Sequence, residues 1–244
     1  MCHRPLPVWC VSLGCPKNRV DTERALGSLG FPAKLVATPG KSKLAFINTC
    51  AFIEPAVRES IREIIDLVKT CSKLKSPPLI AVAGCLPGRY GVEELAREFP
   101  EVGLWLEPAS QAKWPSMIAQ CLNRETNGPD GRLTPAGASY AWLKICDGCD
   151  HKCSFCAIPS IRGKFQSERR ESLLSEAREL VSRGVKELIL VGQDITAWGK
   201  DLGPGEGDLI SLLGELAGLE GLRWLRALYL YPGAVTKNFV KSIS

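Results

Sequence analysis

The sequence predicts an α/β protein with two domains, an open parallel α/β sheet followed by the first part of a βα barrel. Short apolar runs alternate with amphipathic stretches along the chain, which is the order of strands and helices in βα units. Three cysteines follow successive apolar runs, each 35 residues after the last. A turn-rich segment without periodicity, 124–139, separates the predicted N-terminal domain, 1–123, from the predicted C-terminal domain, 140–244.

In the N-terminal domain, each apolar run that predicts a strand is followed by a predicted helix. The longest helix carries its apolar side chains on one face with a helical period, and Pro55 suits its first turn. The segment 85–91 is expected to be a loop. The predicted strands are 8–13, 44–49, 79–83 and 102–106, and the predicted helices are 18–29, 55–74, a short helix through Phe99 and 110–122.

The C-terminal domain has the same alternation of strands and helices. The predicted strands are 141–145, 187–191 and 224–230, and the predicted helices are 171–183, closed by Gly184, then 208–217 and the start of another at 236–244. A complete βα barrel takes about 250 residues, so this half supplies about three units. We expect the chain to be part of a longer protein, because three parallel strands leave an unpaired edge.

Charge and hydropathy exclude several classes of protein. The chain has 31 Lys and Arg against 26 Asp and Glu, a formal net charge of +5. A balance this mild gives no sign of direct nucleic-acid binding or of coating a membrane. No apolar run is long enough to cross a bilayer, and the first residues lack the apolar stretch of a signal peptide. A cytoplasmic protein is therefore expected.

The cysteine content points to metal chemistry. The chain has 11 cysteines and only 2 histidines. In a reducing cytosol an odd number of cysteines is not expected to form a disulfide framework. Sulfur would therefore be the ligand, which favours zinc or an iron–sulfur cluster.

Cys15, Cys50 and Cys85, which we call the N-terminal triad, each come directly after an apolar run. Because the carboxyl ends of parallel strands meet at one edge of a sheet, the three side chains are expected to lie together there. The alternative is that each is simply a small buried apolar side chain. The shared spacing favours a common site.

A second group is local, Cys149, Cys153 and Cys156 in a C-x3-C-x2-C spacing. Three thiolates on a short loop can hold three corners of a cubane cluster and leave the fourth iron open. Cys146 stands three residues earlier, so a closed structural zinc site or a saturated cluster is the alternative. Its place at the end of a predicted strand favours a structural role, as expected also for Cys2, Cys10, Cys71 and Cys121.

Several segments together resemble a known family, the radical S-adenosylmethionine methylthiotransferases. The segments are SLGCPKN at 12–18, NTCAFIE at 48–54, GCLPGRYG at 84–91, GCDHKCSFCAIPSIRGK at 148–164, and GQDITAWGKDL and LYLYP downstream. The SLGCPKN segment is similar to the branch that modifies ribosomal protein S12. The resemblance covers essentially the whole chain. It also implies further barrel strands and a small TRAM-like C-terminal β-domain, both absent from this sequence.

The resemblance implies two 4Fe-4S clusters and S-adenosylmethionine as cofactors. By similarity, Cys149, Cys153 and Cys156 hold the radical cluster, whose open iron binds S-adenosylmethionine. The N-terminal triad holds an auxiliary cluster that carries the transferred sulfur. The radical removes hydrogen from the β-carbon of an aspartate, which then receives a methylthio group. Residues expected near S-adenosylmethionine are Phe155, Gln193 and Asp194, and Arg162 and Lys164 are expected near its carboxylate.

The resemblance also implies partners and leaves alternatives open. The expected partners are ribosomal protein S12 or the small ribosomal subunit, and an electron donor such as flavodoxin or ferredoxin. The tRNA branch of the family, which modifies N6-isopentenyladenosine, is one alternative. A non-enzymatic iron–sulfur or zinc protein with Cys146 as a fourth ligand is another. Because the barrel is incomplete, this chain is expected to be weak or inactive as an enzyme on its own.

Overall fold

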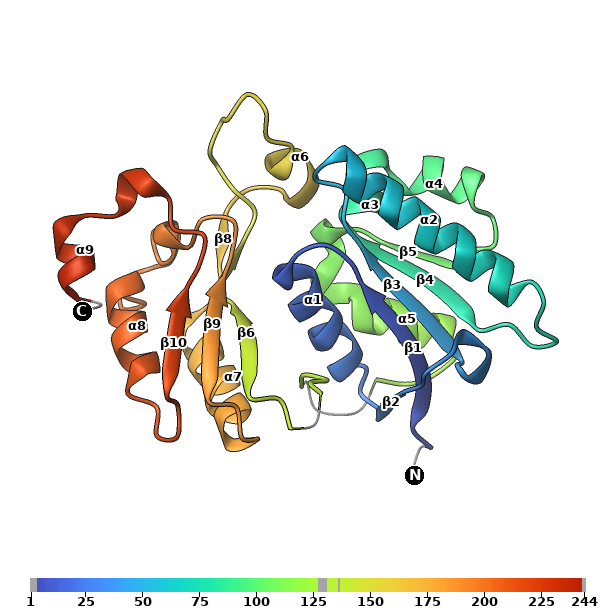
Figure 1. Ribbon diagram of the computed structural model, residues 1–244, viewed down its shortest axis with the longest axis horizontal. Helices are drawn as coiled ribbons and strands as arrows, with labels where there is room; N and C mark the ends of the chain where they lie inside the picture. Colours follow the sequence, from blue (N-terminus) through green and yellow to red (C-terminus); the bar gives the residue numbers. More distant parts are fainter. Residues whose placement is uncertain (1–3, 127–130, 136, 243–244) are drawn as a thin grey trace. The chain divides into compact units, whose positions relative to one another are not determined.

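The computed structural model describes residues 4–126, 131–135 and 137–242, and it divides into two compact units, Met1–Leu133 and Thr134–Ser244 (Figure 1). Both units contain a parallel sheet with helices packed on it, so the predicted α/β class is confirmed. In the part of the chain that the structure describes, no helix is long and apolar enough to span a membrane.

The first unit contains a five-stranded parallel sheet in the order β2-β1-β3-β4-β5. The central strand is buried along its whole length, which explains its continuous apolar run. The strands are β1 (Leu6–Ser12), β2 (Ala33–Leu35), β3 (Leu44–Thr49), β4 (Leu79–Gly84) and β5 (Leu104–Leu106).

Helices cover this sheet. Side chains of α1 and α5 share an apolar core with β1, β3 and β4, and α2 lies on the opposite face (Figure 1). Buried Val57, Ile64 and Leu67 recur along α2 with a helical period, as its sequence predicts. The helices are α1 (Pro16–Gly27), α2 (Glu54–Cys71), α3 (Cys85–Tyr90), α4 (Val92–Glu98) and α5 (Trp114–Cys121), with 3-10 turns η1 (Pro39–Lys41) and η2 (Pro108–Lys113).

Three details of the first unit differ from the sequence-based expectation. The short edge strand β2 was not expected, because its three residues are mostly exposed and carry no apolar pattern. The expected loop at 85–91 is wrong, because α3 occupies most of it between Gly84 and Gly91, both with positive φ. The expected helix at 110–122 is divided, since η2 precedes α5.

The middle of the expected linker, residues 131–133, is bound to α1 of the first unit. The Arg132 side chain is only 2% exposed and forms a 2.7 Å ion pair with Glu23 Oε2. Leu133 N donates to the Glu23 carbonyl oxygen at 2.9 Å. A Cβ at Gly27 would lie 2.5 Å from the Gly131 oxygen, so the segment passes directly against the helix.

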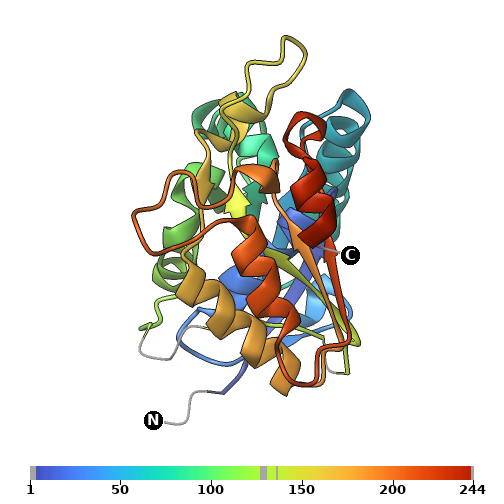
Figure 2. The ribbon, with the colours of Figure 1, turned by 90° about the vertical axis from the view of Figure 1, so that its left-hand side faces the viewer.

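The second unit contains a three-stranded parallel sheet in the order β10-β9-β6 (Figure 1), and Figure 2 shows helices of this unit in front of the sheet. Its core joins Leu143, Leu188 and Leu190 of the strands to Leu173 and Leu212 of the helices. The strands of this sheet are β6 (Tyr140–Lys144), β9 (Glu187–Val191) and β10 (Trp224–Ala227), and the main helices are α7 (Arg170–Ser182) and α8 (Leu209–Ala217).

Short elements lie at the ends of these strands. They are the antiparallel pair β7 (Cys146–Asp147) and β8 (Gln166–Ser167), the helices α6 (Ile158–Arg162) and α9 (Lys237–Ser242), and the 3-10 turns η3 (Ile195–Ala197) and η4 (Pro232–Ala234). The expected strand at 224–230 ends early, at Ala227, because the chain turns at Tyr229, whose φ is +64°. Ile195 N donates to the Tyr229 oxygen at 3.1 Å and fixes this turn to the end of β9.

Candidate functional site

The cysteine loop, residues 148–163, leaves and re-enters the second unit through a narrow neck. Cys149 N donates to the Gly163 oxygen at 3.2 Å across the neck. Gly148 has a φ of +66°, and a Cβ there would lie 2.0 Å from the Lys164 oxygen. Only glycine fits so close an approach of the two chain segments.

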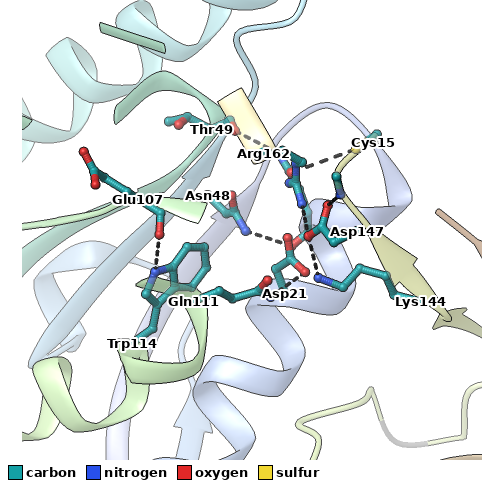
Figure 3. Close-up of polar contacts among 12 residues, drawn as sticks. Cys15, Asp21, Asn48, Thr49, Glu107, Gln111, Trp114, Lys144, Asp147 and Arg162 are labelled. Carbon is teal, nitrogen blue, oxygen red and sulfur yellow. Dashed lines mark hydrogen bonds and ion pairs between the residues drawn. The ribbon is translucent and has the colours of Figure 1, made fainter. Parts of the chain in front are cut away.

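An ion-paired carboxylate lies directly beneath the neck (Figure 3). Asp147 Oδ2 accepts from Lys144 Nζ at 3.0 Å and from Arg162 Nη1 at 2.8 Å, and the side chains of Lys144 and Arg162 are 2% and 1% exposed. Asp147 Oδ1 accepts from Gly148 N at 2.8 Å. Burial raises the pKa of Asp147, but the charges of Lys144 and Arg162 outweigh it and hold that pKa well below its usual range.

The place of Arg162 near the S-adenosylmethionine carboxylate stays a prediction, and the structure shows what its side chain contacts within the protein. Its guanidinium is buried against Asp147, where it joins the end of α6 to the start of the cysteine loop. Lys164, the other cation expected there, is exposed.

The three cysteines of the loop line one cavity of about 230 Å³, together with residues that follow β9 and β10. All three are free thiols. Within the described ranges, no three His, Cys, Asp or Glu side chains are grouped to hold a single metal ion. A cubane cluster takes one thiolate per iron and does not need such a group, so three thiols facing one cavity fit its donor set.

Gln193 and Asp194, both on the cavity wall after β9, offer different chemistry. The Gln193 amide is buried, and neither its Nε2 nor its Oε1 has a hydrogen-bond partner among the described residues. Leaving buried polar atoms without a hydrogen-bond partner costs free energy. Such atoms in the wall of a cavity therefore indicate a ligand site. Asp194, by contrast, accepts from Thr196 N at 3.0 Å through Oδ1 and from His151 Nε2 at 2.8 Å through Oδ2.

Phe155 lies in the loop between the last two cysteines, and its side chain is 86% exposed. It does not line the cavity that the three thiols share. His151, which sequence reasoning missed, does line it. The sequence around His151 does not indicate this place, because its hydrogen-bond partner, Asp194, is 43 residues away in the sequence.

Cys146 has the surroundings of a core residue. It lies in β7 with 0% exposure, and a Cβ at Gly192 would lie 2.3 Å from its Sγ. The thiol donates to the Asp194 carbonyl oxygen at 3.6 Å. Burial, helped by the charges of Asp147 and Asp194, raises the pKa of Cys146 to about 12. This protonated, enclosed thiol does not line the cavity of the other three, which argues against a four-cysteine site.

The N-terminal triad lies at the carboxyl edge of three adjacent strands of the first unit. Cys15 precedes α1 after β1, Cys50 directly follows β3, and Cys85 begins α3 after β4. The register pairs Thr49 with Gly84, so Cys50 and Cys85 are the next residues on neighbouring strands. A Cβ at Gly14, beside Cys15, would lie 2.7 Å from the Cys50 Sγ.

A buried network next to the triad ties these strand ends together, and sequence reasoning missed it. Asn18 Nδ2 donates to the Leu13 oxygen at 3.0 Å and to the Thr49 oxygen at 2.8 Å. Asn48 Nδ2 returns a bond to the Asn18 oxygen at 2.8 Å. Thr49 Oγ1 donates to the Ala83 oxygen at 2.6 Å. The sequence feature that could have indicated this network is the pair of polar residues, Asn48 and Thr49, at the end of the otherwise apolar strand β3.

The remaining cysteines are not part of either group. Cys71 is buried in the apolar face of α2, Cys10 is half-buried in β1, and Cys121 is exposed at the end of α5. Cys2 lies outside the described residues.

Two family models match the chain, one in each unit. Residues 7–107, which contain the N-terminal triad, match the uncharacterized protein family UPF0004. Residues 143–226, which contain the cysteine loop, match the radical SAM superfamily.

Curated relatives that bear the name ribosomal protein uS12 methylthiotransferase RimO match almost the whole chain. The protein of Nitratidesulfovibrio vulgaris (strain DP4) is 52% identical over 235 residues, that of Lawsonia intracellularis 50% over 240, and that of Clostridium perfringens (strain SM101) 42% over 249. The alignments cover 96%, 98% and 97% of this chain and 54%, 54% and 55% of the relatives. The chain thus spans about half the length of these relatives.

A solved structure supports the fold. The radical S-adenosylmethionine methyltransferase TsrM from Kitasatospora setae, with cobalamin and a 4Fe-4S cluster bound, matches with a TM-score of 0.63 at 13% identity. The match covers 98% of this chain and 59% of that one, and at this identity it concerns the fold alone. Each unit thus matches its own family model, the first UPF0004 and the second the radical SAM superfamily, and nearly the whole chain is similar to proteins named ribosomal protein uS12 methylthiotransferase RimO.

Proposed function

We propose that this chain is the cofactor-binding part of a methylthiotransferase that modifies an aspartate of ribosomal protein uS12. The observation that carries the proposal is the cavity in which three free thiols lie beside the unpaired amide of Gln193. Relatives at 50–52% identity that bear this activity in their names support it.

Cys149, Cys153 and Cys156 are the proposed ligands of a 4Fe-4S cluster with one iron left for S-adenosylmethionine. The ion pairs of Asp147 hold the two ends of their loop together. When bound, the cluster and S-adenosylmethionine supply the means of breaking an unactivated C–H bond, which side-chain acids and bases do not break at neutral pH.

Gln193 is the proposed contact to the methionine part of S-adenosylmethionine. Its amide has both a donor and an acceptor without a partner in the protein, and the ligand presents an ammonium and a carboxylate. Asp194 stays a candidate for the same contact, because its carboxylate can accept a further hydrogen bond besides those from His151 and Thr196. Phe155 stays a candidate for the adenine side.

The N-terminal triad is proposed to hold a second 4Fe-4S cluster, which would carry the sulfur to be transferred. The hydrogen bonds of Asn18, Asn48 and Thr49 hold the three strand ends in place. Ser60 adds a fixed point on α2, since its Oγ donates to the Cys50 oxygen at 2.7 Å and accepts from Cys50 N at 3.1 Å.

Two partners complete the proposal. One is ribosomal protein uS12, the substrate in the names of the relatives. The other is a low-potential electron donor such as flavodoxin or ferredoxin, because cleavage of S-adenosylmethionine consumes one electron.

Mass spectrometry of a strain that lacks the gene for this protein tests the proposed substrate. We expect uS12 to lose the methylthio group on its aspartate and the tRNA nucleosides to stay unchanged. Restoring the intact gene should restore the group, and restoring a Cys153→Ala gene should not. Loss of a methylthio nucleoside from tRNA, with uS12 unchanged, would instead assign the protein to the tRNA branch.

A further inference from the structure

His151 ties the middle of the cysteine loop to the sheet of the second unit. It stands two residues after Cys149 and two before Cys153. Its Nε2 donates to Asp194 Oδ2 at 2.8 Å, with the carboxylate oxygen as the acceptor. Its ring stacks on Tyr231, with centroids 4.4 Å apart and planes inclined by 24°. One side chain thus reaches the segments that follow β9 and β10.

The two partners of His151 are themselves held in place. Asp194 caps η3, with its Oδ1 accepting from both Thr196 N and Thr196 Oγ1. The segment before Tyr231 is fixed to the same turn by the bond from Ile195 N to the Tyr229 oxygen. The contacts of His151 therefore join the cysteine loop to two segments that are themselves held by hydrogen bonds.

His151 also stands between two cavities. The cavity of the three thiols, about 230 Å³, and a second of about 520 Å³ are both lined by Cys149, His151, Asp194 and Tyr231. The second cavity extends towards Asp150, Phe165 and Lys200 and contains neither Cys153 nor Cys156. The imidazole ring is therefore part of the wall of both cavities.

We propose that His151 is a positioning residue, which fixes the Cys149–Cys153 segment against the ends of β9 and β10 and closes one side of the cluster cavity. This inference rests on the proposed function, since it concerns how the loop holds its cofactors. The hydrogen bond sets the position of the segment, and the ring stacked on Tyr231 forms part of the cavity wall. Groups that orient metal ligands typically contribute about 10- to 100-fold to affinity or activity.

The test compares His151→Ala, His151→Gln, Tyr231→Leu and Asp194→Asn in the full chain after anaerobic reconstitution of the clusters. Lys152→Ala is the matched control, because Lys152 is the exposed neighbour of His151 in the same loop. Four quantities are measured for each: iron per chain, the Kd of S-adenosylmethionine, the change it causes in the electron paramagnetic resonance spectrum, and the rate of iron release to a chelator.

His151→Ala is expected to keep its iron, to bind S-adenosylmethionine about tenfold more weakly, and to release iron several-fold faster. His151→Gln should recover part of the affinity, because its amide still donates to Asp194, but not the slow release. Tyr231→Leu should likewise keep most of the affinity and lose the slow release, because it leaves the hydrogen bond to Asp194 in place and removes the stacking. The double variant His151→Ala with Asp194→Asn should bind no more weakly than the weaker single variant, because the two residues act through one bond.

A His151→Ala chain with the Kd, spectrum and iron release of the wild type would overturn the inference, and so would fully additive losses in the double variant. If His151→Ala retains no iron, His151→Gln and Tyr231→Leu decide the matter, since each removes only one of the two contacts. A wild-type chain that binds neither iron nor S-adenosylmethionine would refute the proposed function as well. A wild type that binds both, with unaffected variants, would refute this inference alone.

Discussion

Four cysteines lie close together in the sequence of the second unit, but the structure separates one of them from the other three. Cys146 is enclosed by Gly192 and the core, with its thiol bonded to the Asp194 oxygen. Cys149, Cys153 and Cys156 face a cavity. The spacing alone left a four-cysteine site open, because it does not show on which side of a strand the first thiol lies.

Replacing Cys146 with serine is expected to leave the iron content unchanged and to lower the free energy of unfolding by about 1 kcal/mol, because a hydroxyl replaces a thiol in an apolar core. Iron analysis and urea denaturation measure the two effects. Cys153→Ser is the comparison and should lose one cluster. Loss of a cluster in the Cys146 variant would show that this residue is a ligand after all.

Asp147 makes a second prediction at the scale of the residue, a dependence of stability on pH. Its pKa in the folded chain is lower than its ordinary value, so the unfolded chain takes up the proton first as the pH falls. The contribution of the Asp147 carboxylate to the free energy of unfolding is therefore complete above about pH 4, and it is lost as the pH falls through the folded-state pKa of Asp147. Asp147→Asn should cost about 3 kcal/mol at pH 7, because it breaks a buried ion pair.

Urea denaturation of the apo chain from pH 7 to pH 2 checks this prediction. The difference between wild type and Asp147→Asn should shrink below about pH 4. Glu220→Gln, an exposed carboxylate of the same unit, is the control and should show little difference at any pH. A pH-independent difference for Asp147→Asn would mean that its charge contributes nothing.

At the scale of the element, the ends of β3 and β4 determine the place of the N-terminal triad. Gly84 turns the chain from β4 into α3 with a φ of +97°, and a Cβ there would lie 2.1 Å from Asn48 Oδ1 and 2.6 Å from the Thr49 oxygen. Gly91, at the other end of α3, also has a positive φ but has open space around it. A side chain at Gly91 would therefore add backbone strain alone, whereas one at Gly84 would add both strain and a steric clash.

Gly84→Ala is expected to lower the free energy of unfolding by about 3 kcal/mol or more, because strain and a clash with the Asn48 network add together. Gly91→Ala should cost about 1 kcal/mol, from strain alone. Gly84→Ala should also reduce the iron held by the first unit, since it displaces the segments that carry Cys50 and Cys85. Equal costs for the two variants would contradict the close packing at Gly84.

Elements with a long buried pattern were predictable, and short ones fixed by distant partners were not. The buried strands β3 and β9 begin and end where their apolar runs predict. The two-residue strands β7 and β8 have no periodicity to detect. The hydrogen bonds of Asn18 and His151 join residues far apart in the sequence, so no local pattern indicates them.

At the scale of the whole molecule, each unit carries one group of three cysteines at the ends of its parallel strands or in the loop that follows them. The positions of the six cysteines along the chain were readable from the sequence, because strand ends and motif spacing determine them. The contacts that the neighbouring residues make within the protein were not, since Arg162 pairs with Asp147 and Asp194 with His151 across the fold. We therefore propose two separate cluster sites, one in each unit.

The measurement that tests this most directly is the iron and sulfide content of the anaerobically reconstituted chain and of two triple variants. In one variant Cys15, Cys50 and Cys85 are replaced by alanine, and in the other Cys149, Cys153 and Cys156. We predict about eight irons for the wild type and about four for each variant. S-adenosylmethionine should change the spectrum only where the cysteine loop is intact. Bound zinc would contradict the two-site arrangement. So would a wild type with only four irons, if one of the triple variants kept all four.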